Sequence, residues 1–270
     1  MSQSAQELSP FLKWAGGKRW FMNAHRTILP TTYNRYIEPF LGSGAVFFNL
    51  QPKTATLSDI NFELIETYSA VKADWRKVVA LLKRHNGYHS KSYYYEVRKS
   101  RPRTIFGTAA RLIYLNRTCW NGLYRVNRKG EFNVPIGTRT NVLLDTDFER
   151  ISSLLQNTTL KHSDFEPVID DAVKNDLIFV DPPYTVKHNS NGFIKYNENL
   201  FSWDDQIRLF KSLVRAKKRG AKVVVTNAHH ASVIKLYKGD FDLVSAERKS
   251  LIAGSNADRG SYKELIIHHI

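Results

Sequence analysis

The chain has 270 residues, of which 42% are hydrophobic and 24% charged, enough for one large core or a core with a small satellite domain. No apolar run approaches about 20 residues, which excludes a membrane-spanning helix, and residues 1–9 lack the apolar core of a signal peptide. The single cysteine, Cys119, excludes an intramolecular disulfide framework and a Cys-rich zinc site. These features favour a bacterial-type cytoplasmic location.

Positive charge is concentrated in the middle of the chain. The net charge is +15, and residues 71–140 carry 16 Lys and Arg against three acids. The other 200 residues carry 24 Lys and Arg against 22 acids. Tyr and Trp are interleaved with the basic residues of the middle segment. A polyanionic partner such as nucleic acid therefore explains this concentration of positive charge better than a solvated face does.

The N-terminal elements resemble the start of a nucleotide-binding unit. Residues 11–18 read Phe-Leu-Lys-Trp-Ala-Gly-Gly-Lys, which alone is also compatible with a surface turn. A strand-like run over residues 36–40 is followed by a glycine turn at residues 42–44 and a helical pattern over residues 45–50. Strand, Gly-x-Gly and helix form the opening of a dinucleotide-type unit, in which glycines let the backbone approach a ligand.

A second strand over residues 55–58 ends in Asp59, which lies 17 residues after Gly42. An acid at this spacing typically holds a ribose diol, and Ile60 beside it can pack on an adenine ring. The alternative makes Asp59 the cap of a helix that begins near Asn61. The two roles are compatible.

Helical spacing follows over residues 64–71 and 75–82, with further helices predicted over residues 91–99 and 108–115. A break at residues 101–103 separates the last two. This predicts an inserted helical subdomain that coincides with the basic segment.

The subdomain ends in two runs around a turn at residues 128–130, which predicts a β-hairpin near residues 123–135. A two-stranded ribbon can enter the major groove of DNA, where Arg reads guanine. A surface hairpin with solvated basic side chains is an equal alternative from these residues alone.

The second half alternates strands and helices again. Asp145 is predicted to cap a helix that includes Phe148 and Leu155, and a strand over residues 158–161 leads to Asp164 and Phe165. A buried strand over residues 177–180 then stops at Asp181-Pro182-Pro183-Tyr184. That turn places a carboxylate, rigid carbonyls and an aromatic ring at a strand's carboxyl end, where ligands bind in α/β sheets. An ordinary Pro-rich loop is the alternative.

A capping box at residues 202–205 begins the next helix, which ends near Gly220. A strand over residues 222–226 and a final pair over residues 241–249 and 262–269 complete the pattern. The prediction is a doubly wound α/β sheet of Rossmann-like type interrupted by a helical module. We expect residues 1–62 and 143–270 to form the catalytic domain, and residues 63–142 the target-recognition domain.

In combination the motifs resemble the Dam-type DNA adenine methyltransferases of the D12 class, which use S-adenosylmethionine and methylate GATC-type sites. The resemblance covers nearly the whole chain and rests on residues 11–18, 38–44, 59–61, 121–123, 130–135 and 181–184. It implies a mostly parallel seven-stranded sheet whose last strand is antiparallel. It also implies a methyltransferase that needs no metal.

The resemblance implies roles for individual residues. Catalysis would fall to Asp181, Pro182, Pro183 and Tyr184. S-adenosylmethionine would be bound by Trp14, Lys18, Glu38, Phe40, Gly42, Gly44, Asp59, Ile60, Asp164, Phe165 and Asp181. DNA would be contacted by Lys13, Arg117, Trp120, Asn121, Leu123, Arg125, Arg128, Lys129, Asn133, Pro135 and Arg139. The family often has Tyr where this chain has Trp120, so an aromatic wedge is kept although the details of base flipping can differ.

The chemistry can be argued from the residues themselves. An adenine amino nitrogen is a poor nucleophile because its lone pair is delocalised into the ring. If Asp181 and the carbonyl of Pro182 accept its two N–H groups, the nitrogen can pyramidalise and react by in-line displacement. Tyr184 can stack on a target base, which must leave the duplex to reach such a pocket.

Three other functions are compatible with parts of the pattern. One is the same chemistry on RNA, and another is a catalytically silent DNA-binding regulator. A nicotinamide-dependent dehydrogenase is disfavoured because Phe47 occupies the place of the third glycine. We expect double-stranded DNA as partner, no membrane association, a monomer in solution and a nucleoid-associated location.

Overall fold

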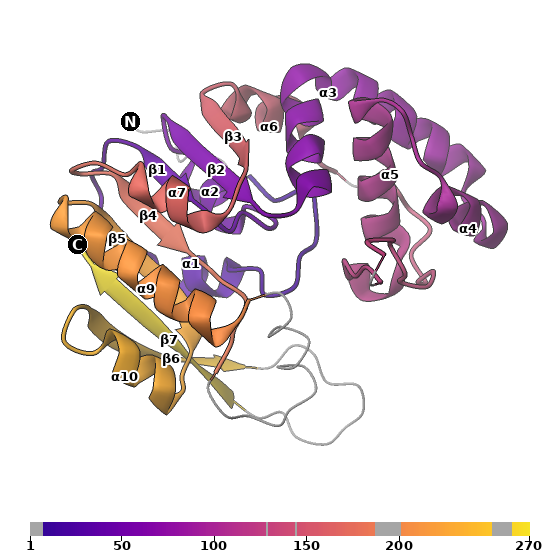
Figure 1. Cartoon of the computed structure of the whole chain (residues 1–270). Helices are drawn as coiled ribbons and strands as arrows, with labels where there is room; N and C mark the ends of the chain where they lie inside the picture. Colours follow the sequence, from indigo (N-terminus) through magenta and orange to yellow (C-terminus); the bar gives the residue numbers. More distant parts are fainter. Residues whose placement is uncertain (1–7, 128, 144, 187–200, 250–260) are drawn as a thin grey trace. The chain divides into compact units, whose positions relative to one another are not determined.

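The computed structural model describes residues 8–127, 129–143, 145–186, 201–249 and 261–270. Seven strands in these segments form one sheet in the order β3-β2-β1-β4-β5-β7-β6 (Figure 1). β1 pairs in parallel with β2 and β4, and β4 with β5, whereas β7 is antiparallel to both β5 and β6. The predicted Rossmann-like fold, with a mostly parallel seven-stranded sheet, is confirmed. The strands are β1 (Tyr36–Glu38), β2 (Ala55–Asp59), β3 (Thr158–His162), β4 (Leu177–Val180), β5 (Lys222–Ala228), β6 (Asp242–Lys249) and β7 (Ser261–His269).

The central strands are apolar because both of their faces are buried. All four residues of β4 are buried, and so are Val223, Val224 and Val225 of β5. Continuous apolar runs are typical of parallel strands covered on both sides. The register pairs Val180 with Val225, so the residues that follow these two strand positions lie beside each other at one edge of the sheet.

The chain divides into two compact units. The first consists of Met1–Met22, Leu41–Lys53 and Asp59–His162, and the second of Asn23–Phe40, Thr54–Ser58 and Ser163–Ile270. These are structural units, and the assignment of catalytic and target-recognition domains to residues 1–62, 63–142 and 143–270 stays a prediction.

The first unit holds most of the helices described. They are α2 (Ala45–Leu50), α3 (Phe62–Tyr88), α4 (Lys91–Lys99), α5 (Ile105–Thr118), η2 (Trp120–Gly122) and α6 (Phe148–Leu155), while α1 (Arg19–His25) continues into the second unit. The helices predicted over residues 45–50 and 91–99 are confirmed. The one predicted over residues 108–115 is longer at both ends. It begins earlier because the Thr104 hydroxyl accepts a hydrogen bond from the Gly107 N–H and so caps α5.

α3 consists of two helical stretches joined at Asp74, whose φ of −159° and ψ of 86° are not helical. The Asp74 carboxylate accepts hydrogen bonds from the backbone N–H groups of Arg76 and Lys77. It therefore caps the second stretch, in the manner of an N-cap residue. The two apolar repeats predicted over residues 64–71 and 75–82 correspond to these two stretches.

One predicted helix cap is wrong. The structure caps α6 with Asp147, whose side chain accepts a hydrogen bond from Arg150 N at 2.9 Å, rather than with Asp145. Asp145 precedes Phe148, the first residue of α6, by three positions, which is too early for its side chain to serve as the adjacent cap.

The second unit packs helices against the strands. They are η1 (Arg26–Ile28), α7 (Phe165–Asp170), α9 (Trp203–Lys218) and α10 (Ala231–Tyr237). One buried cluster joins Ile178 and Val225 of the strands with Val168 of α7, Leu213 of α9 and Val233 of α10. The capping box predicted for α9 is present, with reciprocal hydrogen bonds between Ser202 and Asp205.

Candidate functional site

The glycine loop before α2 brings its backbone against an indole ring. Gly42 and Gly44 have φ values of +48° and +64°, which disfavour residues with a side chain. A Cβ atom on Gly42 would lie 2.8 Å from Cδ1 of Trp14, so the loop also lacks room for one. Trp14 in turn stacks on Tyr124, with ring centroids 4.8 Å apart. Two predicted cofactor residues, Trp14 and Gly42, therefore lie in contact.

Asp59 is tied to the same loop. One of its carboxylate oxygens accepts a hydrogen bond from Gly42 N at 3.0 Å, and the other from Asn61 N at 2.9 Å. Burial raises the pKa of Asp59, and these N–H groups oppose that rise. The cap of α3 is Asn61, which accepts from Leu64 N, so the alternative that made Asp59 the cap is wrong.

Two further predicted cofactor residues of the first unit differ in exposure. Ile60 is 69% exposed, which leaves an apolar side chain available beside Asp59. Lys18 is buried, and its Nζ donates a hydrogen bond to the carbonyl of Gly16 at 2.7 Å. A buried ammonium held by the backbone carbonyl of the Gly16-Gly17 turn indicates that Lys18 orders this turn.

In the second unit, the Asp181–Tyr184 turn follows β4 directly. Oδ1 of Asp181 accepts a hydrogen bond from the hydroxyl of Thr226 at 2.9 Å. The phenol of Tyr184 donates to Oε2 of Glu264 at 2.6 Å. Burial, and then the charges of Asp181 and Glu264, raise the pKa of Tyr184 well above its ordinary value, so the phenol stays a donor at neutral pH. Each end of the turn is thus fixed by a side chain from another strand.

The remaining predicted cofactor residues of the second unit are also held firmly. Glu38 is buried at the end of β1 and accepts a hydrogen bond from the Tyr36 phenol at 2.9 Å. The ring of Phe40 stacks on that of Phe165, with centroids 5.4 Å apart. Phe40 and Phe165 thus lie in contact.

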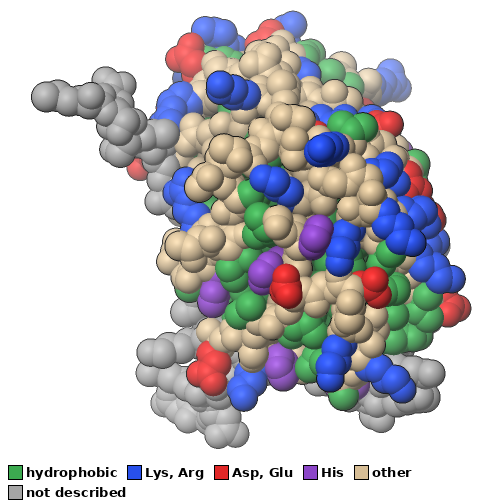
Figure 2. Space-filling model, turned by 90° about the vertical axis from the view of Figure 1, so that its left-hand side faces the viewer, with side chains coloured by type: hydrophobic (Ala, Val, Ile, Leu, Met, Phe, Trp, Pro, Cys, Tyr) green, Lys and Arg blue, Asp and Glu red, His purple; other side chains and the backbone are tan. Residues whose placement is uncertain are grey.

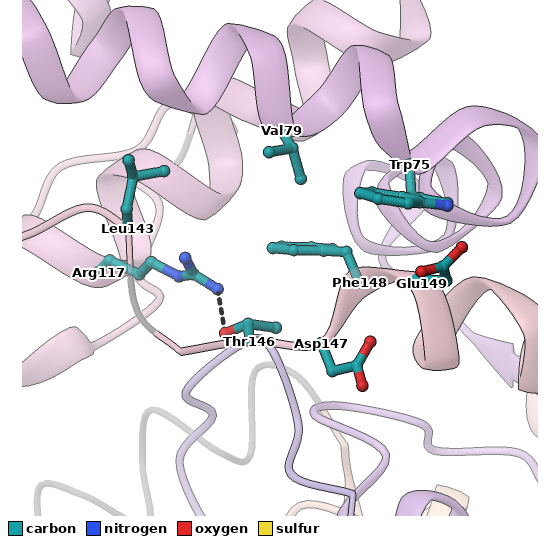
Figure 3. Close-up of a pocket in the computed structure, with 8 residues that line it drawn as sticks. All are labelled: Trp75, Val79, Arg117, Leu143, Thr146, Asp147, Phe148 and Glu149. Atoms are coloured by element: carbon teal, nitrogen blue, oxygen red, sulfur yellow. Dashed lines mark hydrogen bonds between the residues drawn. The ribbon is translucent and has the colours of Figure 1, made fainter.

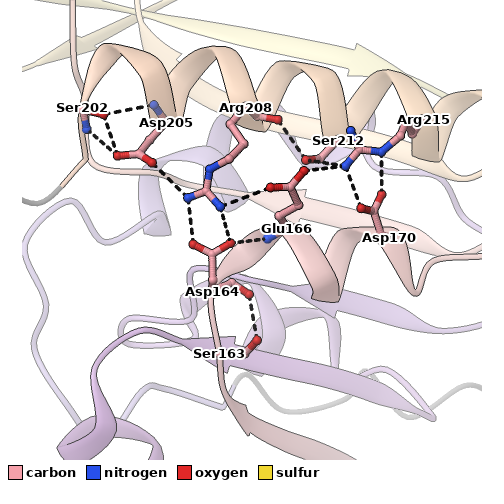
Figure 4. A network of polar contacts seen from close by, with 9 residues as sticks. All are labelled: Ser163, Asp164, Glu166, Asp170, Ser202, Asp205, Arg208, Ser212 and Arg215. Atoms are coloured by element: carbon pink, nitrogen blue, oxygen red, sulfur yellow. Dashed lines mark hydrogen bonds and ion pairs between the residues drawn. The ribbon is translucent and has the colours of Figure 1, made fainter.

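Asp164 lies in a network of ion pairs (Figure 4). Its two carboxylate oxygens accept from the two terminal nitrogens of Arg208 at 2.8 and 2.9 Å, and one of them also caps α7 through Glu166 N. The Arg208 guanidinium lies over the ring of Phe165, 4.3 Å from its centroid. Asp164 is therefore a fixed carboxylate, and its ion-pair partner also covers the neighbouring predicted cofactor residue.

The predicted hairpin is present only as a short turn with isolated pairing. Asn133 N donates to Arg125 O and Asn127 N to Glu131 O, and Val126 forms a bridge with Phe132, but none of these residues lies in an assigned strand. The predicted site residue Arg128 lies outside the described residues.

Several side chains of this region are accessible. Trp120 is 53% exposed and Leu123 40%, and Arg125 is exposed with its Nε donating to the Asn133 side chain at 2.9 Å. The other exposed predicted DNA residues are Asn121, Lys129, Pro135 and Arg139, while Asn133 is partly buried. Lys and Arg side chains are also spread over the face drawn in Figure 2, as the net charge of +15 leads one to expect.

Lys13 is anchored beside this region by backbone hydrogen bonds. Lys13 N donates to Oδ1 of Asn116, and Nδ2 of Asn116 donates back to Lys13 O, both at 2.8 Å. The same Asn116 amide donates to Gly122 O at 3.3 Å. Burial and then the positive charge of Arg139 lower the pKa of the Lys13 ammonium, so these two predicted DNA residues lie near each other.

Arg117 does not belong to an exposed surface, so its predicted contact with DNA is wrong. Its side chain is 2% exposed and donates to the carbonyls of Val142 and Phe11 and to the hydroxyl of Thr146. Figure 3 shows it on the wall of a pocket of about 230 Å³ that also includes Phe148. Burial lowers the pKa of this guanidinium to about 10. Arg117 is a structural residue that joins α5 to the segment before α6.

A sequence profile of the D12 class of N6 adenine-specific DNA methyltransferases matches residues 14–252. The chain belongs to this family. It is an adenine-specific DNA methyltransferase. One relative is the type II methyltransferase M1.LlaDCHI of Lactococcus lactis subsp. cremoris, 36% identical, with coverage of 96% of this chain and 95% of the relative. M.MjaIII of Methanocaldococcus jannaschii is 35% identical over 97% of this chain and 100% of its own, and a DNA adenine methylase of Vibrio cholerae is 32% identical over 95% and 94%.

Sequence reasoning missed three residues of this methyltransferase that hold predicted site residues. Asn116 holds Lys13, Thr226 holds Asp181, and Glu264 holds Tyr184. Asn116 and Thr226 left a signal, because each is a polar residue beside apolar neighbours on its helix or strand, whereas Glu264 follows Lys263 in a polar stretch of β7 and left none. All three are buried, and buried polar groups almost always have a partner.

Two structural absences concern only the described segments. There, no group of three or more His, Cys, Asp or Glu side chains is arranged to hold a metal ion. No helix within them has the length and apolar character needed to cross a bilayer.

Proposed function

We propose that this methyltransferase transfers the methyl group of S-adenosylmethionine to the exocyclic amino nitrogen of an adenine flipped out of duplex DNA, within GATC or a close relative. The observation that carries the proposal is the Asp181–Tyr184 turn at the carboxyl end of buried β4, with its carboxylate and its phenol both held by hydrogen bonds. Ligands of open α/β sheets bind at this edge.

The turn supplies what an amino nitrogen needs to become a nucleophile. The Asp181 carboxylate and the Pro182 carbonyl are acceptors on adjacent residues, and together they can receive both N–H groups of the adenine amino group. Accepting both draws the nitrogen toward a pyramidal geometry and makes its lone pair available. The ring of Tyr184 offers a face on which the flipped base can stack.

S-adenosylmethionine fits the residues of the first unit. Gly42 lies against Trp14 so closely that a Cβ atom would collide with the indole, so the loop and the indole form one surface against which the cofactor would bind. The Asp59 carboxylate can accept hydrogen bonds from the ribose hydroxyls, and exposed Ile60 can cover one face of the adenine. Lys18 orders the turn at Gly16. When bound, the cofactor supplies an electrophilic methyl group.

The second unit offers further proposed contacts for the cofactor. Glu38 is a buried carboxylate at the end of β1. The stacked rings of Phe40 and Phe165 form an apolar surface, and Asp164 is fixed beside Phe165 by Arg208. A carboxylate whose position is set in advance can receive a ligand N–H group with little cost in entropy.

For DNA recognition we propose the residues predicted around the hairpin turn, of which Arg128 lies outside the described residues. Trp120 would enter the base stack and Asn121 the vacated position, while Leu123, Arg125 and Pro135 would read base edges. Backbone phosphates would be contacted by Lys13, Arg128, Lys129, Asn133 and Arg139. Support comes from the exposure of Trp120 and Leu123 and from the resemblance of residues 121–123 and 130–135 to the Dam-type motifs. Arg117 is left out because it is buried.

The test is transfer of a labelled methyl group to oligonucleotide duplexes. We expect transfer to a GATC duplex and none to a GAAC control, and Asp181→Ala should abolish transfer while DNA binding largely survives. 2-Aminopurine at the target adenine should brighten on binding, because unstacking relieves its quenching. A wild-type enzyme that methylates no adenine in any duplex would refute the proposal.

A further inference from the structure

Thr226 occupies the position on β5 that faces the catalytic turn. The parallel register pairs Val180 with Val225, so the next residues, Asp181 and Thr226, are neighbours. Thr226 is fully buried, and its hydroxyl lies 2.9 Å from Oδ1 of Asp181. A threonine hydroxyl has a single proton to donate, and a carboxylate accepts it without losing its capacity for further hydrogen bonds.

Glu264 holds Tyr184 in the way that Thr226 holds Asp181, by a hydrogen bond from a neighbouring strand. It lies on β7, where the antiparallel register pairs it with Ala228 of β5. Glu264 is 6% exposed, and its Oε2 accepts the Tyr184 phenol at 2.6 Å. A charge-assisted hydrogen bond of this length fixes the position of the phenol oxygen, and with it the outer end of the Tyr184 ring.

These two side chains have a common arrangement. Each is buried, on the strand next to β4 or one strand further away. Thr226 holds Asp181 and also forms a hydrogen bond with the Tyr184 side chain, while Glu264 holds Tyr184, so both contact the same four-residue turn. Burying a carboxylate such as that of Glu264 costs free energy unless it is hydrogen-bonded, and here the Tyr184 phenol supplies a hydrogen bond. A buried polar group that contacts a residue proposed to react is well suited to orient that residue.

We propose that Thr226 and Glu264 are positioning residues for methyl transfer. Thr226 sets the plane of the Asp181 carboxylate toward the adenine amino group, and Glu264 fixes the ring on which the target base stacks. The proposal rests on the function proposed above for Asp181 and Tyr184. Neither residue contacts the substrate, and both act through the residue that does.

Thr226 is tested by two substitutions that differ only in the hydroxyl and one methyl group. Thr226→Val keeps the shape and removes the donor, whereas Thr226→Ser keeps the donor. We expect the single-turnover rate constant on a GATC duplex to fall about 10- to 100-fold in the Val variant and to recover to within about threefold in the Ser variant. The dissociation constants for DNA and S-adenosylmethionine should stay within about twofold of wild type. Thr226→Ala serves as a second variant without the hydroxyl if Thr226→Val does not fold.

Glu264 is tested through its coupling to Tyr184. We expect Tyr184→Phe and Glu264→Ala each to slow transfer and to reduce the 2-aminopurine signal, and the double variant to be no slower than the worse single variant. Glu264→Gln keeps an acceptor oxygen and should retain most of the rate. Losses that simply multiply in the double variant would show that Glu264 does not act through Tyr184.

The activity of the wild-type enzyme distinguishes failure of the positioning role from failure of the proposed function. If it methylates duplex adenine but Thr226→Val reacts at the wild-type rate, or Thr226→Ser is as slow as Thr226→Val, the positioning role is refuted and the proposed function stands. If the wild type methylates no duplex adenine, both fail together. Urea unfolding of every variant identifies a rate loss that comes from unfolded protein.

Discussion

Replacing Gly42 with alanine tests the close approach of the loop backbone to the indole of Trp14. Gly42 has a φ of +48°, and a Cβ atom there would lie 2.8 Å from Cδ1 and 3.3 Å from Nε1 of Trp14. Both atoms belong to a rigid ring that stacks on Tyr124. The alanine methyl group can be accommodated only if the indole or the loop moves.

The expected loss of stability in Gly42→Ala has two contributions. An L-residue in the left-handed region costs about 1–2 kcal/mol, and overpacking a filled site costs about 1–3 kcal/mol. Gly42→Ala should therefore destabilise the fold by about 2–5 kcal/mol. Gly130 is the matched control, since its φ is +74° but no atom lies within 4 Å of the added Cβ. Gly130→Ala should lose only the first contribution, about 1–2 kcal/mol.

Urea unfolding gives the stability difference, and calorimetric titration with S-adenosylmethionine gives the affinity. We expect Gly42→Ala to bind the cofactor about tenfold more weakly than wild type, equivalent to ~1.4 kcal/mol, and Gly130→Ala to bind it normally. Any gain from a stiffer unfolded chain is common to both variants and cancels in the comparison. Equal stability and equal cofactor affinity of the two variants would refute the role assigned to the contact with Trp14.

Three further predictions use the same purified enzyme. Burial, assisted by the charge of Arg84, lowers the pKa of His85 to about 4. Between about pH 6.5 and 4 the unfolded chain therefore binds a proton that the folded chain does not, so the free energy of unfolding should fall as the pH drops from about 6.5 toward 4. The expected loss is about 1–2 kcal/mol after allowance for partial exposure. Urea midpoints at pH 7 and pH 5 measure this, and a His85→Gln variant with the same pH slope as wild type would contradict it. Arg117→Met should lose about 2–4 kcal/mol of stability, since it leaves buried carbonyls without donors. The salt dependence of its DNA binding should equal that of the wild type. A changed salt dependence with unchanged stability would show that Arg117 contacts DNA after all. Arg125→Ala should keep its stability within about 0.5 kcal/mol of wild type but discriminate less between GATC and its single-base variants. Competition between duplexes measures this discrimination. If it is unchanged at all four positions, Arg125 does not read a base.

Much of the fold could be predicted from local patterns. The apolar runs at β4 and β5, the capping box at Ser202 and the two apolar repeats of α3 each depend on residues close together in sequence. The Asp74 break could not be predicted, because it depends on a side chain that caps a helix from inside an otherwise helical pattern. The cap at Asp147 was missed because two acids stand close together and only backbone geometry distinguishes them.

The place of a candidate site residue in the fold could be predicted where its own neighbours define it. Gly42 and Asp181 are examples, since each follows a strand and lies in a turn, and the roles proposed for them remain predictions. Arg117 is a residue for which sequence reasoning fails: its positive charge predicts contact with DNA, but α5 is buried on all sides from Ala109 to Thr118, and this depends on elements distant in sequence. The hydrogen bond between Lys13 and Asn116 joins residues 103 apart, and local spacing carries no information about such a pair.

That last separation has a consequence for synthesis of the protein. A ribosome adding about 5–20 residues per second completes Asn116 only about 5–20 s after Lys13, given the 103 residues between them. Until then the backbone around Lys13 lacks the amide that accepts from its N–H and donates to its carbonyl. We therefore expect the backbone around Lys13 to stay open to proteases on stalled nascent chains that end before α5, and to become protected once α5 has left the exit tunnel.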